Sequence, residues 1–283
     1  MIKMCDLHTH SNFSDGTYSP SELLDMAIRS NVSAIALCDH NTVSGLNDFI
    51  EAAKSTDIEA VSGVEISAEY KSKEVHILGL FVDSYYYDAL ENYLRAININ
   101  KENNNLDLIA TLNNDGYKID YVSVKEIAGD AVPNRVHFAR TLLKRGYVQT
   151  IDEAFDSVLS PEAGLYHPPK RLDAFDVISF LKSVKAVPVM AHPLLNLSYE
   201  ELCEFLPQAK ENGLCGLETI YSLFDEQDTL KVKKLANRFQ LLESGGSDFH
   251  GKNKPDIKIG IGKGDLMIPI DFYNNLKSVK EGM

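Results

Sequence analysis

Hydrophobic and polar positions follow two different periods along the first 90 residues. Short apolar runs at 2–7 and 33–38 predict buried strands. A helix between them is predicted to begin at Ser19, because Glu22 follows three residues later as in a capping box. A second amphipathic helix is expected over 43–54. Strands and helices that alternate in this way indicate an α/β fold.

The next two apolar runs predict a hairpin. Strands are expected at 58–68 and 74–82, and the segment between them is too short for a parallel crossover. If the turn is centred on the Tyr70–Lys71 bond, Glu65 faces His76 across the ladder. The hairpin would then bring a carboxylate beside an imidazole.

The middle of the chain has a different pattern. Apolar residues recur there at helical spacing and strand signals are few, so we interpret 91–165 as a helical insertion domain. Alternation resumes afterwards, and a larger domain is expected from 1–90 and 166–283. The further helices are predicted at 134–145, 151–159, 173–185, 199–212 and 226–238, and the further strands at 187–191, 215–220 and 240–244.

Charge and cysteine content narrow the function classes. Lys and Arg number 28 against 41 Asp and Glu, and the resulting net charge of −13 argues against a protein that binds duplex nucleic acid along its surface. Any bound phosphate must be held by local positive charge. The four cysteines form no C-x-x-C pair, and no stretch resembles a membrane span, so a cytoplasmic protein without a membrane partner is predicted.

Histidines gather at the ends of the predicted strands. One histidine at a strand end is usually structural, but six of the eight lie at or beside such ends, where barrel-type α/β folds assemble their sites. These six are His8, His10, His40, His76, His192 and His250. His8 and His10 are two residues apart and share a face of their strand. Asp6 beside them either orients a ring nitrogen or is a polar strand-end residue.

Three carboxylates accompany these histidines. Asp15, Glu65 and Asp248 supply hard oxygen ligands, which brings the set to nine. First-row metals bind four to six groups, so two to three divalent cations are implied. Since no cysteine belongs to the set, manganese, iron or zinc in an open catalytic site is favoured over structural zinc.

The motifs around these residues also occur together in a known family. They are Asp6–Ser11 with Ser14–Gly16, Leu37–Thr42, Gly63–Ser67, the strand of His76, Ala191–Pro193 and Gly245–Gly251. In this order they resemble the PHP (polymerase and histidinol phosphatase) superfamily of metal-dependent phosphoesterases. The resemblance implies a distorted (β/α)7 barrel with three metal positions. It implies one metal at His8, His10, Glu65 and Asp248, a second at Glu65, His76 and His192, and a third at Asp15, His40 and His250.

The insertion points to a subgroup. The segments Asn134–His137 and Gly216–Tyr221 resemble those of PHP enzymes that act on nucleoside 3′,5′-bisphosphates and on the 5′ ends of short oligonucleotides. In that subgroup the first segment reads Gly-Arg-Pro-His. The resemblance places Arg135 near the substrate phosphate, although Arg135 could also be a solvated helix residue. His137 is a phosphate contact, a leaving-group acid or a core residue of the insertion. Lys170 and Arg171 could contact a second phosphate or be a solvated basic pair, and Tyr221 could stack on a base or belong to the barrel core.

These residues predict an enzyme, a phosphoric ester hydrolase. We expect a hydroxide that bridges the two metals sharing Glu65 to attack phosphorus, with Glu65, His192, Asp248, Arg135 and His137 as the catalytic set. The expected substrate is a nucleotide or short oligonucleotide. One alternative is a histidinol-phosphate-type phosphomonoesterase, and another is an amidohydrolase cleaving C–N bonds. The sequence leaves the oligomeric state open.

Overall fold

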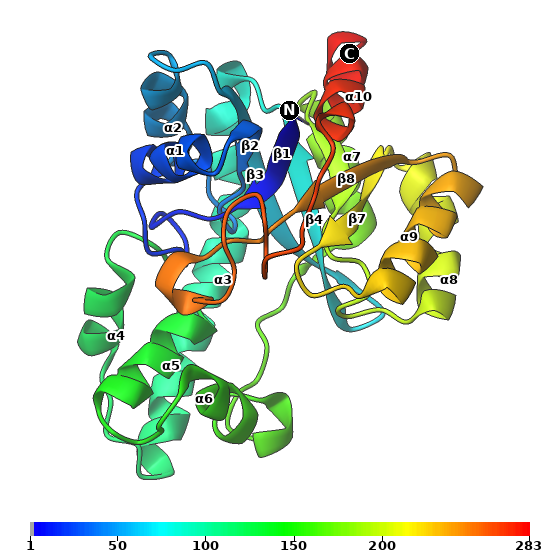
Figure 1. Ribbon diagram of the computed structural model, residues 1–283. Coiled ribbons are helices and arrows are strands. Elements are labelled where there is room, and N and C mark those ends of the chain that lie inside the picture. The colour runs from blue at the N-terminus through cyan, green and yellow to red at the C-terminus, as the bar shows by residue number, and fades with distance from the viewer. Residues whose placement is uncertain (1–2) are drawn as a thin grey trace.

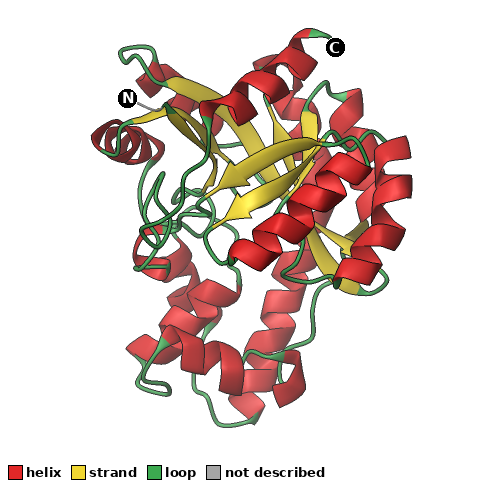
Figure 2. Cartoon of the chain, turned by 45° about the vertical axis from the view of Figure 1, so that its right-hand side comes forward, coloured by secondary structure: helices red, strands yellow, loops and turns green. Residues whose placement is uncertain are grey.

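The computed structural model describes residues 3–283 and contains one eight-stranded sheet rolled into a nearly closed barrel. Helices surround the barrel, and a group of further helices extends from one end (Figures 1 and 2). The α/β barrel predicted from the sequence is confirmed. The strand expected at 2–7 is β1, and position 2 lies outside the described residues.

The sheet runs in the order β1-β2-β3-β4-β6-β7-β8, with the short β5 paired beside β3. Strand β4 is antiparallel to both of its neighbours, whereas the other pairs are parallel. The C-terminal end of β1 is hydrogen-bonded to the segment that follows β8. Asp248 N donates to His8 O, and His10 N donates to Phe249 O. The strands are β1 Met4–Thr9, β2 Val32–Leu37, β3 Glu59–Tyr70, β4 Lys73–Leu80, β5 Leu172–Asp173, β6 Val187–Met190, β7 Gly216–Tyr221 and β8 Leu242–Gly246.

Most helices follow a strand and cover the outside of the barrel. The capping box predicted for the first of them is present, because the Ser19 side chain accepts from Glu22 N and the Glu22 carboxylate accepts from Ser19 N. The barrel helices are α1 Pro20–Arg29, α2 Leu46–Ala53, α7 Ala174–Ser183, α8 Tyr199–Glu211, α9 Glu226–Arg238 and α10 Ile270–Glu281, and the short 3-10 helices are Ser84–Tyr86, Pro161–Ala163 and Gly251–Asn253.

The inner face of the sheet changes from apolar to polar along the barrel axis. Near one end, Val61 of β3 and Leu78 of β4 belong to one hydrophobic cluster with Phe272 of α10. The sequence analysis did not predict helix α10. Side chains alternate along a strand, so Glu65 shares the face of Val61, and His76 shares the face of Leu78. The same strands therefore supply core residues at one end and candidate ligands at the other.

The predicted register of the β3–β4 hairpin is wrong by two residues. The turn consists of Lys71 and Ser72, both in the left-handed region with φ of 49° and 64°, as two-residue hairpins require. Tyr70 therefore pairs with Lys73, and Glu65 lies opposite Leu78 rather than His76. Neither turn residue is the Asn or Gly that normally marks such a turn, so the sequence carried no signal for its position.

The four helices that extend from the barrel have a hydrophobic cluster of their own. Helix α3 joins the two regions, because Leu94 packs in the barrel cluster and Leu112 in the second one. The division into domains at residues 91 and 165 stays a prediction. The helices are α3 Tyr87–Asn114, α4 Tyr121–Ala128, α5 Arg135–Lys144 and α6 Ile151–Ser157. We call the region 91–165 the insertion.

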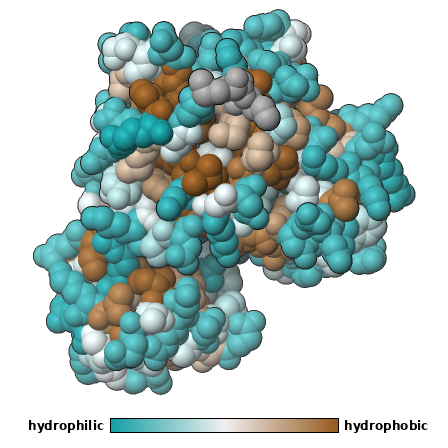
Figure 3. All heavy atoms as spheres, viewed as in Figure 1, coloured by the Kyte–Doolittle hydropathy of each residue, from teal (hydrophilic) through white to brown (hydrophobic). Residues whose placement is uncertain are grey.

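The surface is largely hydrophilic in the view of Figure 3, with small separate apolar patches. Among the helices of residues 3–283, none has the length and apolar character needed to cross a bilayer. The longest, α3, carries charged and asparagine residues along much of its length.

Candidate metal centre and active site

The nine predicted ligands converge on one cavity at the polar end of the barrel. They come from β1, β3 and β4 and from the loops that follow β1, β2, β6 and β8. Seven of them line a cavity of about 350 Å³, and His8 and His10 are fully buried next to these seven. The structure therefore brings the whole predicted set together.

Glu65 lies at the centre of this set and is fully buried. Its Oε2 is 3.3 Å from Nε2 of both His8 and His10 and 3.0 Å from Nδ1 of His40. Its Oε1 is 2.8 Å from Nδ1 of His76 and 3.0 Å from Nε2 of His192. The two oxygens thus face two different groups of imidazoles, which suits a carboxylate that bridges two cations.

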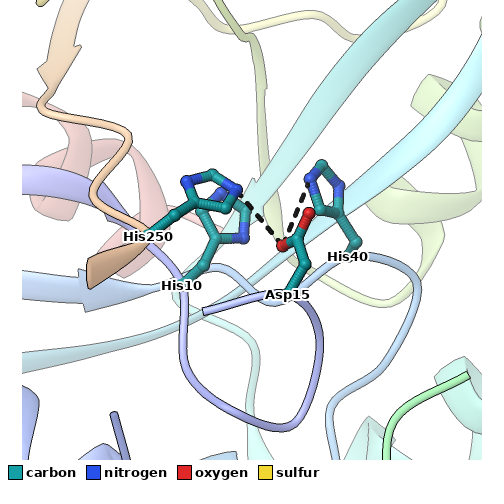
Figure 4. A group of neighbouring side chains, drawn as sticks. All are labelled: His10, Asp15, His40 and His250. Atoms are coloured by element: carbon teal, nitrogen blue, oxygen red, sulfur yellow. Dashed lines mark ion pairs between the residues drawn. The ribbon is translucent and has the colours of Figure 1, made fainter. Parts of the chain in front are cut away.

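Asp15 and His250 form a second group beside the first (Figure 4). His250 Nε2 is 3.2 Å from Oδ1 of Asp15, and its ring stacks on His10 at 4.1 Å between centroids. His40 Nε2 is 3.9 Å from the same Asp15 oxygen, while its Nδ1 faces Glu65. His40 therefore lies between two of the predicted metal positions.

Asp248 joins the two groups. Its Oδ1 is 3.2 Å from His10 Nε2 and 3.3 Å from His250 Nδ1. Its Oδ2 points the other way, where it accepts hydrogen bonds from Tyr221 Oη at 2.9 Å and Lys254 Nζ at 2.6 Å. One oxygen is thus held by the protein while the other faces the imidazoles.

The donor set fits divalent cations. Five buried polar atoms at its centre lack a hydrogen-bond partner among the residues described, namely His8 Nε2, His10 Nδ1 and Nε2, His40 Nδ1 and Glu65 Oε2. Buried polar atoms almost always have a hydrogen-bond partner. A cluster of nitrogen and oxygen atoms without one therefore marks a place for a cation that accepts their lone pairs. In three groups of such residues the ligand atoms lie within 4.8 Å of one another.

Burial and neighbouring charges together shift the pKa values of the clustered imidazoles and carboxylates. Burial alone would raise the pKa of Glu65, but His40, His76 and His8 hold it well below its usual range. Burial opposes the charged form of His8 as well, yet Glu65 and Glu218 keep its pKa well above the usual value. His10 differs, because burial and the neighbouring His250 and His40 lower its pKa.

Cation binding is expected to release protons and to tighten as the pH rises. Burial would lower the pKa of His76, but Glu65 and Glu74 raise it from 6.5 to about 10. The metal-free protein therefore holds this proton at neutral pH, and a cation must displace it. The stability that the charged His76 contributes is present below pH 6.5 and is lost as the pH rises through about 10.

Calorimetric titration with Mn²⁺ in two buffers of different ionisation enthalpy measures this proton release. An apparent binding enthalpy that is the same in both buffers, together with an affinity that does not change between about pH 6.5 and 9, would contradict the prediction.

Two of the predicted ligands have left-handed φ values without being glycine. His192 has φ of 28° and Asp248 has φ of 56°. Such residues cost about 1–3 kcal/mol each and persist only where the surroundings hold them. His192 N donates to Oε2 of Glu218 at 2.7 Å, and Asp248 N donates to His8 O at 2.8 Å. These bonds aim both side chains into the cavity.

Sequence reasoning gave no role to two supporting acids. Glu218 of β7 is fully buried, and its Oε1 lies 3.1 Å from Nδ1 of His8, so it orients that ring. Glu74 plays the same part for His76, with its Oε1 3.2 Å from Nε2. Asp6 instead accepts from the backbone of Ser247 and Gly260, which makes it a structural strand-end residue. Two signals were available for Glu218: it falls inside a predicted buried strand and inside the segment Gly216–Tyr221 that resembles the subgroup.

Most of the residues predicted to bind substrate line the cavity. Arg135 lines the cavity, with its guanidinium 5.0 Å from the ring centre of Tyr166 and Nη2 3.9 Å from Glu74. Lys170 also lines the cavity and is exposed. Tyr221 lines it too, but it is buried and its hydroxyl is bound to Asp248.

His137 does not lie among the residues that line the cavity. It is 2% exposed in the third position of α5, and its Nδ1 accepts a hydrogen bond from Asn134 N at 3.0 Å. Burial lowers its pKa to about 4. The ring is therefore neutral at physiological pH and helps to cap the helix, as the core alternative describes.

Three further cations line the cavity, and of these the sequence analysis gave a possible site role only to Arg171. Arg171 Nη2 donates to Glu74 at 2.7 Å, and Lys254 binds Asp248. Lys101 of α3 reaches the cavity from the insertion, and burial lowers the pKa of its ammonium group. With Arg135 and Lys170, five cationic side chains surround the cavity.

Comparison with known proteins places this architecture in a family. A family model described as the PHP domain matches residues 6–155, which is more than half of the chain. This chain belongs to the PHP domain family. The matched residues include the predicted ligands from His8 to His76, and the predicted ligands His192, Asp248 and His250 follow in the remainder of the barrel.

Individual PHP relatives cover almost the full chain. A 5′-3′ exoribonuclease of Haemophilus influenzae is 30% identical over 88% of this chain and 91% of its own length. A 3′,5′-nucleoside bisphosphate phosphatase of Chromobacterium violaceum is 27% identical over 90% of each chain. A crystal structure from Bifidobacterium adolescentis, described as a metal-dependent phosphoesterase, superposes with a TM-score of 0.87 at 25% identity and covers 98% of this chain and 96% of that one.

Proposed function

We propose that this PHP protein is a metal-dependent phosphoesterase that hydrolyses phosphate esters of nucleotides. The observation that carries the proposal is the convergence of six imidazoles and three carboxylates on one cavity, with Glu65 touching five of the imidazoles. Such a nitrogen and oxygen donor set without thiolates suits catalytic divalent metals.

Two to three divalent cations would occupy this site, with manganese, iron and zinc as the candidates. One would be held by His8, His10, Glu65 and Asp248, a second by Glu65, His76 and His192, and a third by Asp15, His40 and His250. When bound, divalent cations lower the pKa of a water to about 7 and neutralise the charge on a phosphoryl group. No side chain is then required as a nucleophile.

The substrate is a terminal phosphate on a nucleotide or the 5′ end of a short oligonucleotide. The two relatives named above support this class, since one acts on RNA from its 5′ end and the other on nucleoside bisphosphates. A cavity of about 350 Å³ is the size of a small-molecule site rather than a duplex groove. The net charge of −13 repels long polyanions, while the five cations at the cavity attract a small one.

The protein's own side chains then have separate tasks. Arg135 reaches into the cavity from the insertion, and its planar fork can bind two phosphate oxygens. Glu218 orients His8, and Glu74 orients His76. Tyr221 and Lys254 hold one oxygen of Asp248, so that the other faces the imidazoles.

A substrate panel tests the proposal directly. The protein is loaded with Mn²⁺, and phosphate or mononucleotide release is measured from adenosine 3′,5′-bisphosphate, 5′-phosphorylated short RNA and histidinol phosphate, with amides and lactones alongside. We expect turnover of the nucleotides. Preference for histidinol phosphate would support the phosphomonoesterase alternative, and turnover of amides alone would support the amidohydrolase. A fully metallated protein inert towards every phosphate ester would refute the proposal.

Replacing Arg135 with alanine is expected to lower kcat/KM for adenosine 3′,5′-bisphosphate by about 10- to 100-fold, because a phosphate loses a two-point, charge-assisted contact. Arg145→Ala is the matched control. Arg145 is also in the insertion, where it pairs with exposed Asp120 and does not line the cavity. Steady-state phosphate release from both variants makes the comparison, and equal kinetics would leave Arg135 without a substrate role.

A further inference from the structure

Asn134 connects the insertion to the predicted metal centre. Its Nδ2 donates a 2.8 Å hydrogen bond to Oδ2 of Asp15, 119 residues earlier in the chain. Asn134 is half-buried and immediately precedes α5, whereas Asp15 lies in the loop after β1. A single side chain of the insertion therefore contacts a carboxylate that faces His40 and His250.

The same amide also holds the start of α5. Its Oδ1 accepts a 3.1 Å hydrogen bond from Val136 N, and the backbone N of Asn134 donates to Nδ1 of His137. The amide oxygen serves the helix and the amide nitrogen serves Asp15, so both ends of the group are used. Serine caps a helix equally well but is too short to make the second bond.

The bond to Asn134 determines which oxygen of Asp15 faces the imidazoles. With Oδ2 occupied, Oδ1 lies 3.2 Å from His250 Nε2 and 3.9 Å from His40 Nε2 (Figure 4). Asp15 is 4% exposed, so protein partners rather than bulk solvent surround most of its carboxylate. Without the amide, its carboxylate could rotate about the side-chain bonds and offer a less ordered ligand.

We propose that Asn134 is a positioning residue that couples docking of the insertion to cation binding at Asp15, His40 and His250. This inference rests on the metal centre proposed above. Because coupling between two events is reciprocal, a docked insertion strengthens cation binding, and a bound cation holds the insertion against the barrel by the same factor. The cavity between the two parts would then be completed only when the cation is in place.

The test compares Asn134→Ser with the wild-type protein by Mn²⁺ binding and by hydrogen exchange. Equilibrium dialysis with metal analysis is expected to show one Mn²⁺ site weakened by about 10- to 100-fold, the usual cost of losing a partner of a metal ligand. Mn²⁺ should slow amide exchange in α5 of the wild-type protein and should do so less in the variant. Circular dichroism confirms folding, and Asn134→Gly, which also caps acceptably, provides a second variant.

Asp120→Ser is the matched control. Asp120 caps α4 of the same insertion by accepting from Ser123 N, and it does not line the cavity. This control is expected to bind Mn²⁺ like the wild-type protein. A Mn²⁺ isotherm of Asn134→Ser that matches the wild type, or an unchanged exchange response in α5, would overturn the inference.

The two proposals fail in different ways. If the wild-type protein binds Mn²⁺ and hydrolyses nucleotides while Asn134→Ser is indistinguishable from it, only the coupling is refuted. If the wild-type protein takes up no Mn²⁺, Fe²⁺ or Zn²⁺, the metal centre is refuted and the coupling with it.

Discussion

Glu65→Gln is expected to abolish phosphate-ester hydrolysis, with kcat/KM falling at least about a thousandfold, or about 4 kcal/mol of transition-state stabilisation. Glutamine has the shape of glutamate but only one oxygen, and its amide nitrogen is a donor. It cannot present one oxygen to His8 and His10 and another to His192, as Glu65 does. It also removes the negative charge that offsets the bound cations. Phosphate release and metal content per chain are the measurements.

Glu59→Gln is the control for this substitution. Glu59 lies on the same strand, but its side chain is 57% exposed and accepts from the Tyr273 hydroxyl at the opposite end of the barrel. The control should keep both activity and metal. If Glu65→Gln retained more than about a tenth of wild-type turnover with a full metal complement, Glu65 would not be the bridge that its contacts indicate.

His192→Ala and Asp248→Ala are each expected to abolish turnover while the fold persists. His192 Nε2 contacts Oε1 of Glu65 at 3.0 Å, and Asp248 Oδ1 lies between His10 and His250. Each substitution removes one ligand from a cation that the proposed mechanism requires, so the loss should again be at least about a thousandfold. Phosphate release measures activity, and thermal unfolding followed by circular dichroism measures folding.

The controls make the same changes outside the cavity. His167 and Asp256 are exposed residues that do not line it. His167→Ala and Asp256→Ala should therefore behave like the wild-type protein. Turnover at the wild-type rate in a folded His192→Ala or Asp248→Ala variant would show that the corresponding residue is not a required ligand.

The β3–β4 hairpin shows how a partly wrong prediction still located a contact. The predicted register is shifted by two residues, yet Glu65 Oε1 and His76 Nδ1 are 2.8 Å apart. A shift of two leaves every side chain on the same face of the sheet, and diagonal neighbours remain within reach. A shift of one would have placed the two residues on opposite faces.

The substrate-facing side of the site was less accessible to sequence reasoning. Arg135 and His137 are two residues apart in one helix, but only Arg135 lines the cavity. Lys101 reaches the same cavity from α3. The direction in which a helix in the insertion points its side chains depends on how that helix packs against the barrel. Helical periodicity separates the faces of a helix but does not say which face meets the substrate.

Sequence patterns alone were enough to predict the alternation of strands and helices, the family and the nine candidate ligands. These depend on local patterns, because strand boundaries and alternating side chains are set by residues close together in the chain. The partners that hold those ligands could be identified only from the folded chain. Glu218 meets His8 across 210 residues, and Asn134 meets Asp15 across 119. Such contacts arise from the closure of the barrel and the docking of the insertion, which join segments that share no local pattern.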